Sequence, residues 1–99
     1  MIRLTVIYGV PADAAKFDAY YKNVHAPLAA KMPHLKNFTY SRGPVATSNP
    51  EEPVHLVAYL DYETAADLEA SLASEEGKAA VADVANFADG GATILTAEI

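Results

Sequence analysis

The stretch Phe17–Pro33, which reads F-D-A-Y-Y-K-N-V-H-A-P-L-A-A-K-M-P, contains the residues best suited to chemistry. His25 follows Tyr21 by four residues, so a helix would place the imidazole one turn beyond the phenol. An imidazole exchanges protons near neutral pH, and a phenol can position a substrate oxygen through a hydrogen bond. The pair predicts acid/base chemistry, with His25 as the proton carrier and Tyr21 as its hydrogen-bonding partner.

Apolar residues at intervals of three and four predict that this stretch is an amphipathic helix with His25 at the margin of its apolar stripe. Pro27 should kink or restart the helix near Ala26, because proline lacks an N–H and its ring crowds the carbonyl four residues earlier. Such a break can leave a histidine at the rim of a cavity. The alternative is that His25 is structural and the tyrosines belong to the core. The stripe consists of Phe17, Tyr20, Tyr21, Val24 and Leu28.

Five further side chains are candidates for substrate binding: Tyr20 on the helix, and Tyr40, Arg42, His55 and Tyr59 on expected strands. Alternation along a strand puts Tyr40 and Arg42 on one face, and it puts His55 and Tyr59 together in the same way. Periodicity does not decide whether either face lines a cleft. These residues could equally belong to a dimer core or to the rim of the sheet.

The residue pattern predicts no metal and no bound cofactor. Three histidines spread over a helix, a turn and a strand match no metal-ligand spacing, and the chain has no cysteine. There is no G-x-G-x-x-G after a strand, and Gly90-Gly91 leads into a strand rather than a helix. Any reduction would therefore need electrons from elsewhere.

Four strands and two helical regions are expected in the order β-α-β-β-α-β. This order predicts a ferredoxin-like α+β sandwich, in which two helices cover one face of a four-stranded antiparallel sheet. Asp13 and Thr64 are the expected N-caps, and Ser74 should restart the second helical region. A length of 99 residues predicts a single domain, residues 1–99. The expected strands are 1–8, 37–42, 54–62 and 92–99.

The second face of this sheet also needs a cover. Neither face of the 54–62 strand is wholly polar, and 52% of the residues are hydrophobic, which is high for so short a chain. Helices cover only one face, and a symmetric partner presenting the same face is the usual solution. We therefore expect a homodimer.

Charge and hydropathy exclude several classes of partner. The net charge is −6 and no basic cluster occurs, which argues against nucleic acid and against anionic membranes. No apolar run has the length of a membrane span, and the N-terminus lacks the pattern of a signal peptide. The expected location is the cytoplasm.

The whole chain resembles the EthD family of dimeric α/β-barrel proteins. The similarity rests on the strand M-I-R-L-T-V-I-Y, on the Phe17–Pro33 stretch and on D-V-A-N-F at Asp83–Phe87. Its most specific part is the tyrosine pair, the histidine four residues after the second tyrosine, and the proline two further on. The resemblance implies the fold, a dimer, and a cleft between helix and sheet in each subunit.

The resemblance implies chemistry only loosely, because one fold hosts many activities. The family is named after a protein encoded alongside an ether-cleaving cytochrome P450 system, and its members are often labelled reductases. Related barrels include cofactor-free monooxygenases, polyketide cyclases and lactone isomerases. One hypothesis is therefore a cofactor-independent enzyme, an oxidoreductase, isomerase or cyclase, acting on a small apolar or aromatic molecule. The other is a non-catalytic carrier for a partner oxygenase. A third, a dimer with no small-molecule role, predicts a filled core.

Overall fold

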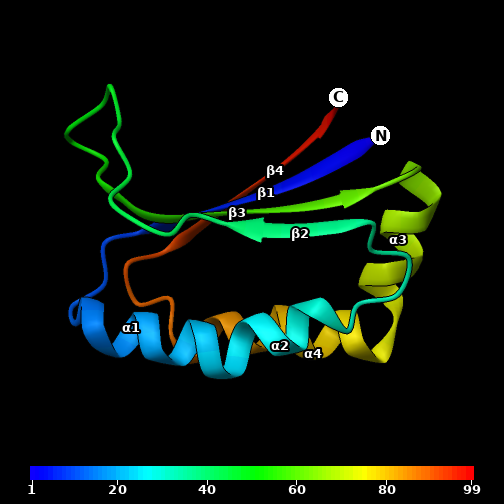
Figure 1. Cartoon of the computed structure of the whole chain (residues 1–99), viewed down its shortest axis with the longest axis horizontal. Coiled ribbons are helices and arrows are strands. Elements are labelled where there is room, and N and C mark those ends of the chain that lie inside the picture. The colour runs from blue at the N-terminus through cyan, green and yellow to red at the C-terminus, as the bar shows by residue number, and fades with distance from the viewer.

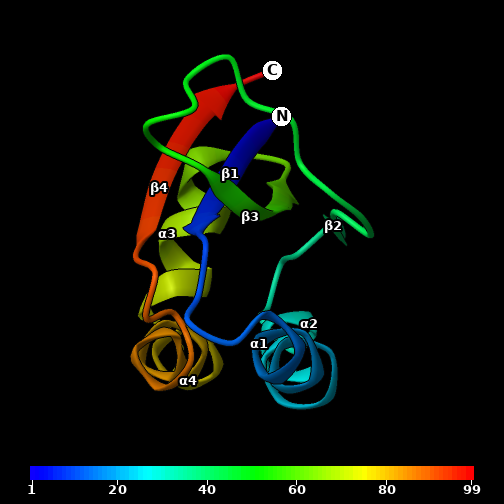
Figure 2. The ribbon, with the colours of Figure 1, turned by 90° about the vertical axis from the view of Figure 1, so that its left-hand side faces the viewer.

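One antiparallel sheet lies over a layer of helices, as Figures 1 and 2 show from two sides. The computed structural model describes residues 1–99. The sheet order is β2-β3-β1-β4. This arrangement confirms the predicted ferredoxin-like α+β fold. The strands are β1 (Ile2–Gly9), β2 (Asn37–Tyr40), β3 (Val54–Tyr62) and β4 (Ala92–Glu98), and the α-helices are α1 (Ala14–Tyr20), α2 (Ala26–Ala30), α3 (Ala65–Ala73) and α4 (Glu75–Asp83).

Alternation along β1 separates the two faces of the sheet. Leu4, Val6 and Tyr8 are buried on the face that the helices cover, and the residues between them point to the open face. The same alternation holds along most of β3, whose predicted bounds are confirmed. β2 is shorter than predicted and ends at Tyr40. After one further hydrogen bond, from the Ser41 N–H to the sheet, the chain enters the loop before β3.

The first helical region changes its winding in the middle. Asp13 caps α1 as predicted, accepting a hydrogen bond from the Lys16 N–H at 3.1 Å. A π-helical segment, Tyr21–His25, separates α1 from α2, so that the Ala26 N–H bonds to the carbonyl of Tyr21, five residues back. The helix thus restarts at Ala26, as Pro27 predicts. The wider turn is accommodated here because the nearby Pro27 has no N–H with which to form a regular helical hydrogen bond.

The π-helical segment corrects the predicted apolar stripe. In a regular α-helix Val24 would lie within the stripe and His25 at its margin. The extra residue in the wider turn rotates both side chains. Val24 is 40% exposed, whereas His25 is only 5% exposed. The imidazole therefore lies inside the stripe.

The second helical region is two helices that meet at Ser74, which caps α4 by accepting a hydrogen bond from the Gly77 N–H at 3.0 Å. Thr64 caps α3, also as predicted. Along α4, Val81 is exposed and Ala80 is buried. A methyl group on Gly77 would overlap the carbonyl of Ser71, so glycine lets the two helices meet closely.

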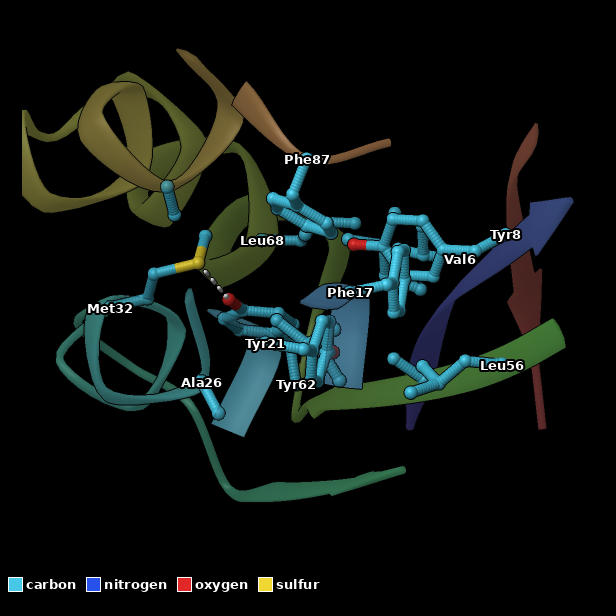
Figure 3. Close-up of a cluster of buried hydrophobic side chains, with 14 residues drawn as sticks. Val6, Tyr8, Phe17, Tyr21, Ala26, Met32, Leu56, Tyr62, Leu68 and Phe87 are labelled. Carbon is cyan, nitrogen blue, oxygen red and sulfur yellow. Dashed lines mark hydrogen bonds between the residues drawn. The ribbon is translucent and has the colours of Figure 1, made fainter. Parts of the chain in front are cut away.

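Aromatic rings fill much of the space between the helices and the sheet (Figure 3). Tyr8 of β1 packs edge-on against Phe17 and Tyr21, each with ring centroids 5.6 Å away. Phe87, after α4, packs on Tyr8 at 5.5 Å. Such contacts between rings stabilise a core beyond the area that they bury. They fix the helix that carries His25 against the sheet.

Candidate active site

A cavity of about 420 Å³ lies between the helices and the inner face of the sheet. Fifteen of its 16 lining residues are hydrophobic, and the exception is His25. Tyr8 and Tyr21 supply the two hydroxyl groups in the lining. Exposed Val81 of α4 and Ile94 of β4 also line it, which places the opening between these two elements. An apolar cavity with a few polar groups is the usual form of a small-molecule site.

His25 is paired with a buried carboxylate. Its Nδ1 atom lies 3.0 Å from Oδ2 of Asp83, which ends α4. Both side chains are more than nine-tenths buried. An ionised carboxylate can only accept hydrogen bonds, so the proton lies on Nδ1 and the Nδ1–H group donates a hydrogen bond to Asp83.

Asp83 is held by three donors. Its Oδ1 atom accepts hydrogen bonds from the Tyr20 hydroxyl at 2.5 Å and from the Asn86 amide at 3.1 Å, and its Oδ2 atom faces His25. Burial by itself raises the pKa of Asp83. The hydrogen bonds from Tyr20, Asn86 and His25 outweigh burial and hold the pKa below its usual value. The carboxylate is therefore ionised at neutral pH.

Nε2 of His25 is available to a ligand. It forms no hydrogen bond within the protein, yet no fully shielded side-chain nitrogen or oxygen lacks a partner. Nε2 is therefore not fully shielded, and the His25 side chain lines the cavity. Burial lowers the pKa of His25, while the hydrogen bond and charge of Asp83 oppose the fall. The imidazole is neutral at physiological pH and can accept a proton at Nε2.

Both cavity tyrosines remain protonated. Burial raises the pKa of Tyr8 and that of Tyr21 well above the ordinary value, because a phenolate would be poorly solvated there. The two hydroxyls are close enough to influence each other's pKa. At neutral pH they can donate hydrogen bonds to an oxygen of a bound molecule.

The structure brings some of the predicted site residues together and separates others. His25 and Tyr21 line the cavity, with ring centroids 5.2 Å apart. Tyr20 does not line it but supports Asp83 from outside. Tyr59 lies on the open face of the sheet, where the Arg3 guanidinium is 4.7 Å from its ring centroid.

Three of the predicted residues line a different, outer cleft. They are Tyr40, Arg42 and His55. The expectation that His55 shares a face with Tyr59 is wrong. The pairing of β1 with β3 shifts between Tyr8 and Gly9, which makes His55 an extra residue in a β-bulge. The bulge turns its ring toward α1, where Nε2 lies 2.7 Å from Asp18 Oδ1.

Asp83 and Tyr8 also belong to the site, although no sequence pattern predicts either of them there. The D-V-A-N-F segment contains Asp83 and was recognised only as a family feature. Nothing in the spacing brings a carboxylate 58 residues away onto His25. Alternation along β1 buries Tyr8 on the inner face, but alternation alone does not link that face to the histidine. No group of three or more His, Cys, Asp or Glu side chains converges in a way that could hold a metal ion.

The protein is a small ferredoxin-like domain with a cavity between its helices and its sheet, and known proteins share this fold. The EthD domain matches residues 11–91. An uncharacterised 11.0 kDa protein of Rhodococcus erythropolis, encoded in the thcB-thcC intergenic region, is 41% identical over 95 residues, which are 96% of this chain and 91% of the relative. The chain belongs to the EthD family.

Solved structures share this fold. An EthD family protein from Bacillus halodurans superposes with a TM-score of 0.89 at 30% identity, over 100% of this chain and 98% of the other. A dimeric ferredoxin-like protein of unknown function from Thermobifida fusca shares the fold, with a TM-score of 0.72 at 15% identity over 99% and 90% of the two chains. No helix is long and apolar enough to cross a membrane.

Proposed function

We propose that the protein is a cofactor-independent acid/base catalyst acting on a small, mostly apolar molecule in the cavity of each subunit. The observation that carries this proposal is the Asp83–His25 pair within an otherwise apolar lining. Burying two ionisable groups costs stability unless both are well paired. Groups with perturbed pKa values concentrate at functional sites, and the pKa values of His25 and Asp83 are both lowered.

The geometry supports a simple proton transfer. Nε2 of His25 would accept a proton from an acidic C–H or O–H of the ligand, and Asp83 would stabilise the resulting imidazolium. The negative charge left on the ligand oxygen would accept hydrogen bonds from Tyr21 and Tyr8, which remain protonated. The cavity has no side chain other than these to bind a charged group. The substrate is therefore an apolar or aromatic compound with a carbonyl or phenol.

Loss of a proton next to a carbonyl or from a phenol gives an electron-rich anion. Isomerisation, cyclisation and reaction with molecular oxygen all start from such an anion. This common step accommodates the isomerase-like, cyclase-like and oxidoreductase chemistry considered for the family. Which step follows depends on the ligand and on whether oxygen reaches it.

Native mass spectrometry of the protein purified from its own host is the first test, because a retained molecule gives a reproducible extra mass. The ligand so identified is then incubated with the protein in D₂O. Catalysis predicts deuterium uptake by the ligand, with a rate that falls by about a hundredfold or more in His25→Gln. His34→Gln is the matched control, because that side chain is half exposed and outside the cavity.

The alternative is a non-catalytic carrier that shelters the same molecule for a partner oxygenase. The apolar lining favours it, since a carrier needs only a dry cavity of the right size. A carrier predicts the retained mass but no deuterium uptake above the uncatalysed rate. It also predicts that His25→Gln changes binding little.

The proposed assembly is a homodimer formed through the open face of the sheet. Thr5 of β1 pairs with Tyr59 of β3 and with Leu95 of β4, so the three side chains form a row across this face. Leu95 is half exposed, and Tyr59 is also exposed. The dimeric relative from Thermobifida fusca supports a second copy as the cover.

A further inference from the structure

A second hollow lies on the outside of the molecule, and we name it the polar cleft. It is bounded by α1 with the start of the π-helical segment on one side, and on the other by the chain leaving β2 and the start of β3. Its volume is about 640 Å³, and only three of its ten lining residues are hydrophobic. The residues that bear on its chemistry are Asp18, Lys22, Tyr40, Arg42, Val54 and His55.

Two cationic side chains without a carboxylate partner line the polar cleft. The protein carries a net charge of −6 and has only seven Lys and Arg residues. Arg3 and Lys36 form ion pairs with carboxylates, whereas Lys22 and Arg42, like the other three lysines, form none, and only Lys22 and Arg42 line the polar cleft. The Arg42 guanidinium instead lies 4.5 Å from the ring centroid of Tyr40. This cation–π contact holds the guanidinium in place with its hydrogen-bond donors free.

The one acidic residue of the polar cleft already has a partner. Asp18 Oδ1 lies 2.7 Å from Nε2 of His55. The His55 ring packs edge-on against Phe17, with centroids 4.9 Å apart, so its position is fixed by the core. Asp18 forms no hydrogen bond or ion pair with Lys22 or Arg42, although its charge still disfavours a bound anion.

The geometry points to a binding site for a small organic carboxylate in the polar cleft. A guanidinium presents a planar pair of N–H donors that matches the two oxygens of a carboxylate, and the Lys22 ammonium adds a second positive charge. Val45 and Val54 provide an apolar wall for the body of the molecule. Nothing in the proposed acid/base chemistry assigns this site a role.

The polar cleft is separate from the apolar cavity. Tyr21 lines the cavity and Tyr40 lines the polar cleft, and their rings meet edge-on with centroids 4.9 Å apart. This pair forms the wall between the two sites. A carboxylate in the polar cleft would therefore bind whether or not the cavity is catalytic.

Benzoate is the probe that tests the site, and benzamide is its uncharged control of the same shape. Titration of the ¹⁵N-labelled protein with benzoate should shift the amide signals of Ser41, Arg42 and Val54, which line the cleft. The double variant Lys22→Gln/Arg42→Gln should weaken benzoate binding by about tenfold or more, because it removes charge-assisted hydrogen bonds. Asp18→Asn should strengthen binding about two- to fivefold, because a like charge is removed.

The matched control for charge is Lys31→Gln/Lys78→Gln, which removes two exposed cations outside the polar cleft. Weakening by the control as large as that by the cleft variant would overturn the proposal, since it would report only the overall field. Benzamide shifting the same signals with the same affinity would also overturn it. So would benzoate shifts confined to residues of the apolar cavity. Shifts restricted to the polar cleft and lost in its double variant support it.

Discussion

Asp83 and His25 influence each other's protonation across a 3.0 Å hydrogen bond. Burial favours the neutral imidazole, and the carboxylate works against burial by favouring the imidazolium. The pair thus combines a neutral base in the resting state with a counter-charge that stabilises the protonated state. This balance is what a general base at neutral pH requires.

Asp83→Asn should lower the pKa of His25 further, because the variant retains the shape of the side chain but removes the opposing charge. The pKa is measured from the imidazole ¹⁵N and ¹H signals as a function of pH. His34, which is half exposed and far from Asp83 in the sequence, provides the reference within the same spectra. An unchanged His25 titration would show that the carboxylate does not act on the imidazole.

The same pair predicts how stability responds to acid. The folded-state pKa of His25 is below 6.5, so the unfolded chain binds more protons as the pH falls through 6.5. The free energy of unfolding should therefore decrease on acidification from pH 6.5 down to the folded-state pKa. Asp83, whose pKa is below 3.8 in the fold, adds a second loss of stability when the pH falls below 3.8. Stability is highest above both windows.

Urea unfolding at a series of pH values measures this dependence. His25→Gln should flatten the upper window, because the variant lacks the titrating group. A slope that persists in His25→Gln would assign the upper window to other groups.

At the scale of elements, the π-helical segment decides which side chain enters the cavity. Its wider turn brings His25 onto the same side as Tyr21 and sends Val24 to solvent. Val24→Lys should therefore change the free energy of unfolding by no more than about 0.5 kcal/mol. Ala29→Lys on α2, where the residue is buried, should cost about 3 kcal/mol or more. Equal costs in urea unfolding would contradict the described winding.

The contact between α3 and α4 depends on Gly77. Gly77→Ala should destabilise the protein by about 2 kcal/mol or more, because the methyl group meets the backbone carbonyl of Ser71, which cannot rotate away. Gly43→Ala is the matched control, since nothing surrounds that position, and it should be neutral or slightly stabilising. Thermal unfolding of both variants compares them directly. A stable Gly77→Ala protein would mean that the helices can separate without cost.

Local signals account for the elements that the sequence predicted. Asp13, Thr64 and Ser74 act on N–H groups within three residues, so their caps follow from local chemistry. The alternation along Val54–Tyr62 likewise gives the strand directly. The π-helical turn and the β-bulge at His55 are single-residue insertions, and each moves a side chain to another face. Regular periodicity cannot locate such insertions, because it assumes a constant number of residues per turn.

The sequence predicts only the part of the candidate site whose residues are close together along the chain. Tyr21 and His25 are one turn apart, so their proximity follows from helix geometry. Asp83 reaches His25 only because α1 and α4 pack against the same face of the sheet (Figure 2). The pairing of an imidazole with one of 13 acidic residues depends on that packing, and composition gives no preference among them.

For the whole molecule, the open face of the sheet combines apolar side chains with an ion pair that is already satisfied. Arg3 donates two hydrogen bonds to Asp61, at 2.8 and 3.0 Å, and these hold the pKa of Asp61 below its usual value. The Arg3 guanidinium also stacks on Tyr59. Charges paired within one subunit can be covered by a partner at a smaller cost than free charges. The face therefore tolerates burial in a homodimer.

Leu95→Asp should convert the proposed dimer into a monomer. Two-fold symmetry introduces the new charge twice into one interface, so we expect the dissociation constant to rise by about a hundredfold or more. Val10→Asp is the matched control, because Val10 is equally exposed but lies in the turn after β1 rather than on the sheet. Sedimentation equilibrium of the three proteins gives the dissociation constants. If the wild type is a monomer, or if both variants dissociate alike, the open face is not the dimer interface, and its half-exposed Leu95 must be covered in another way.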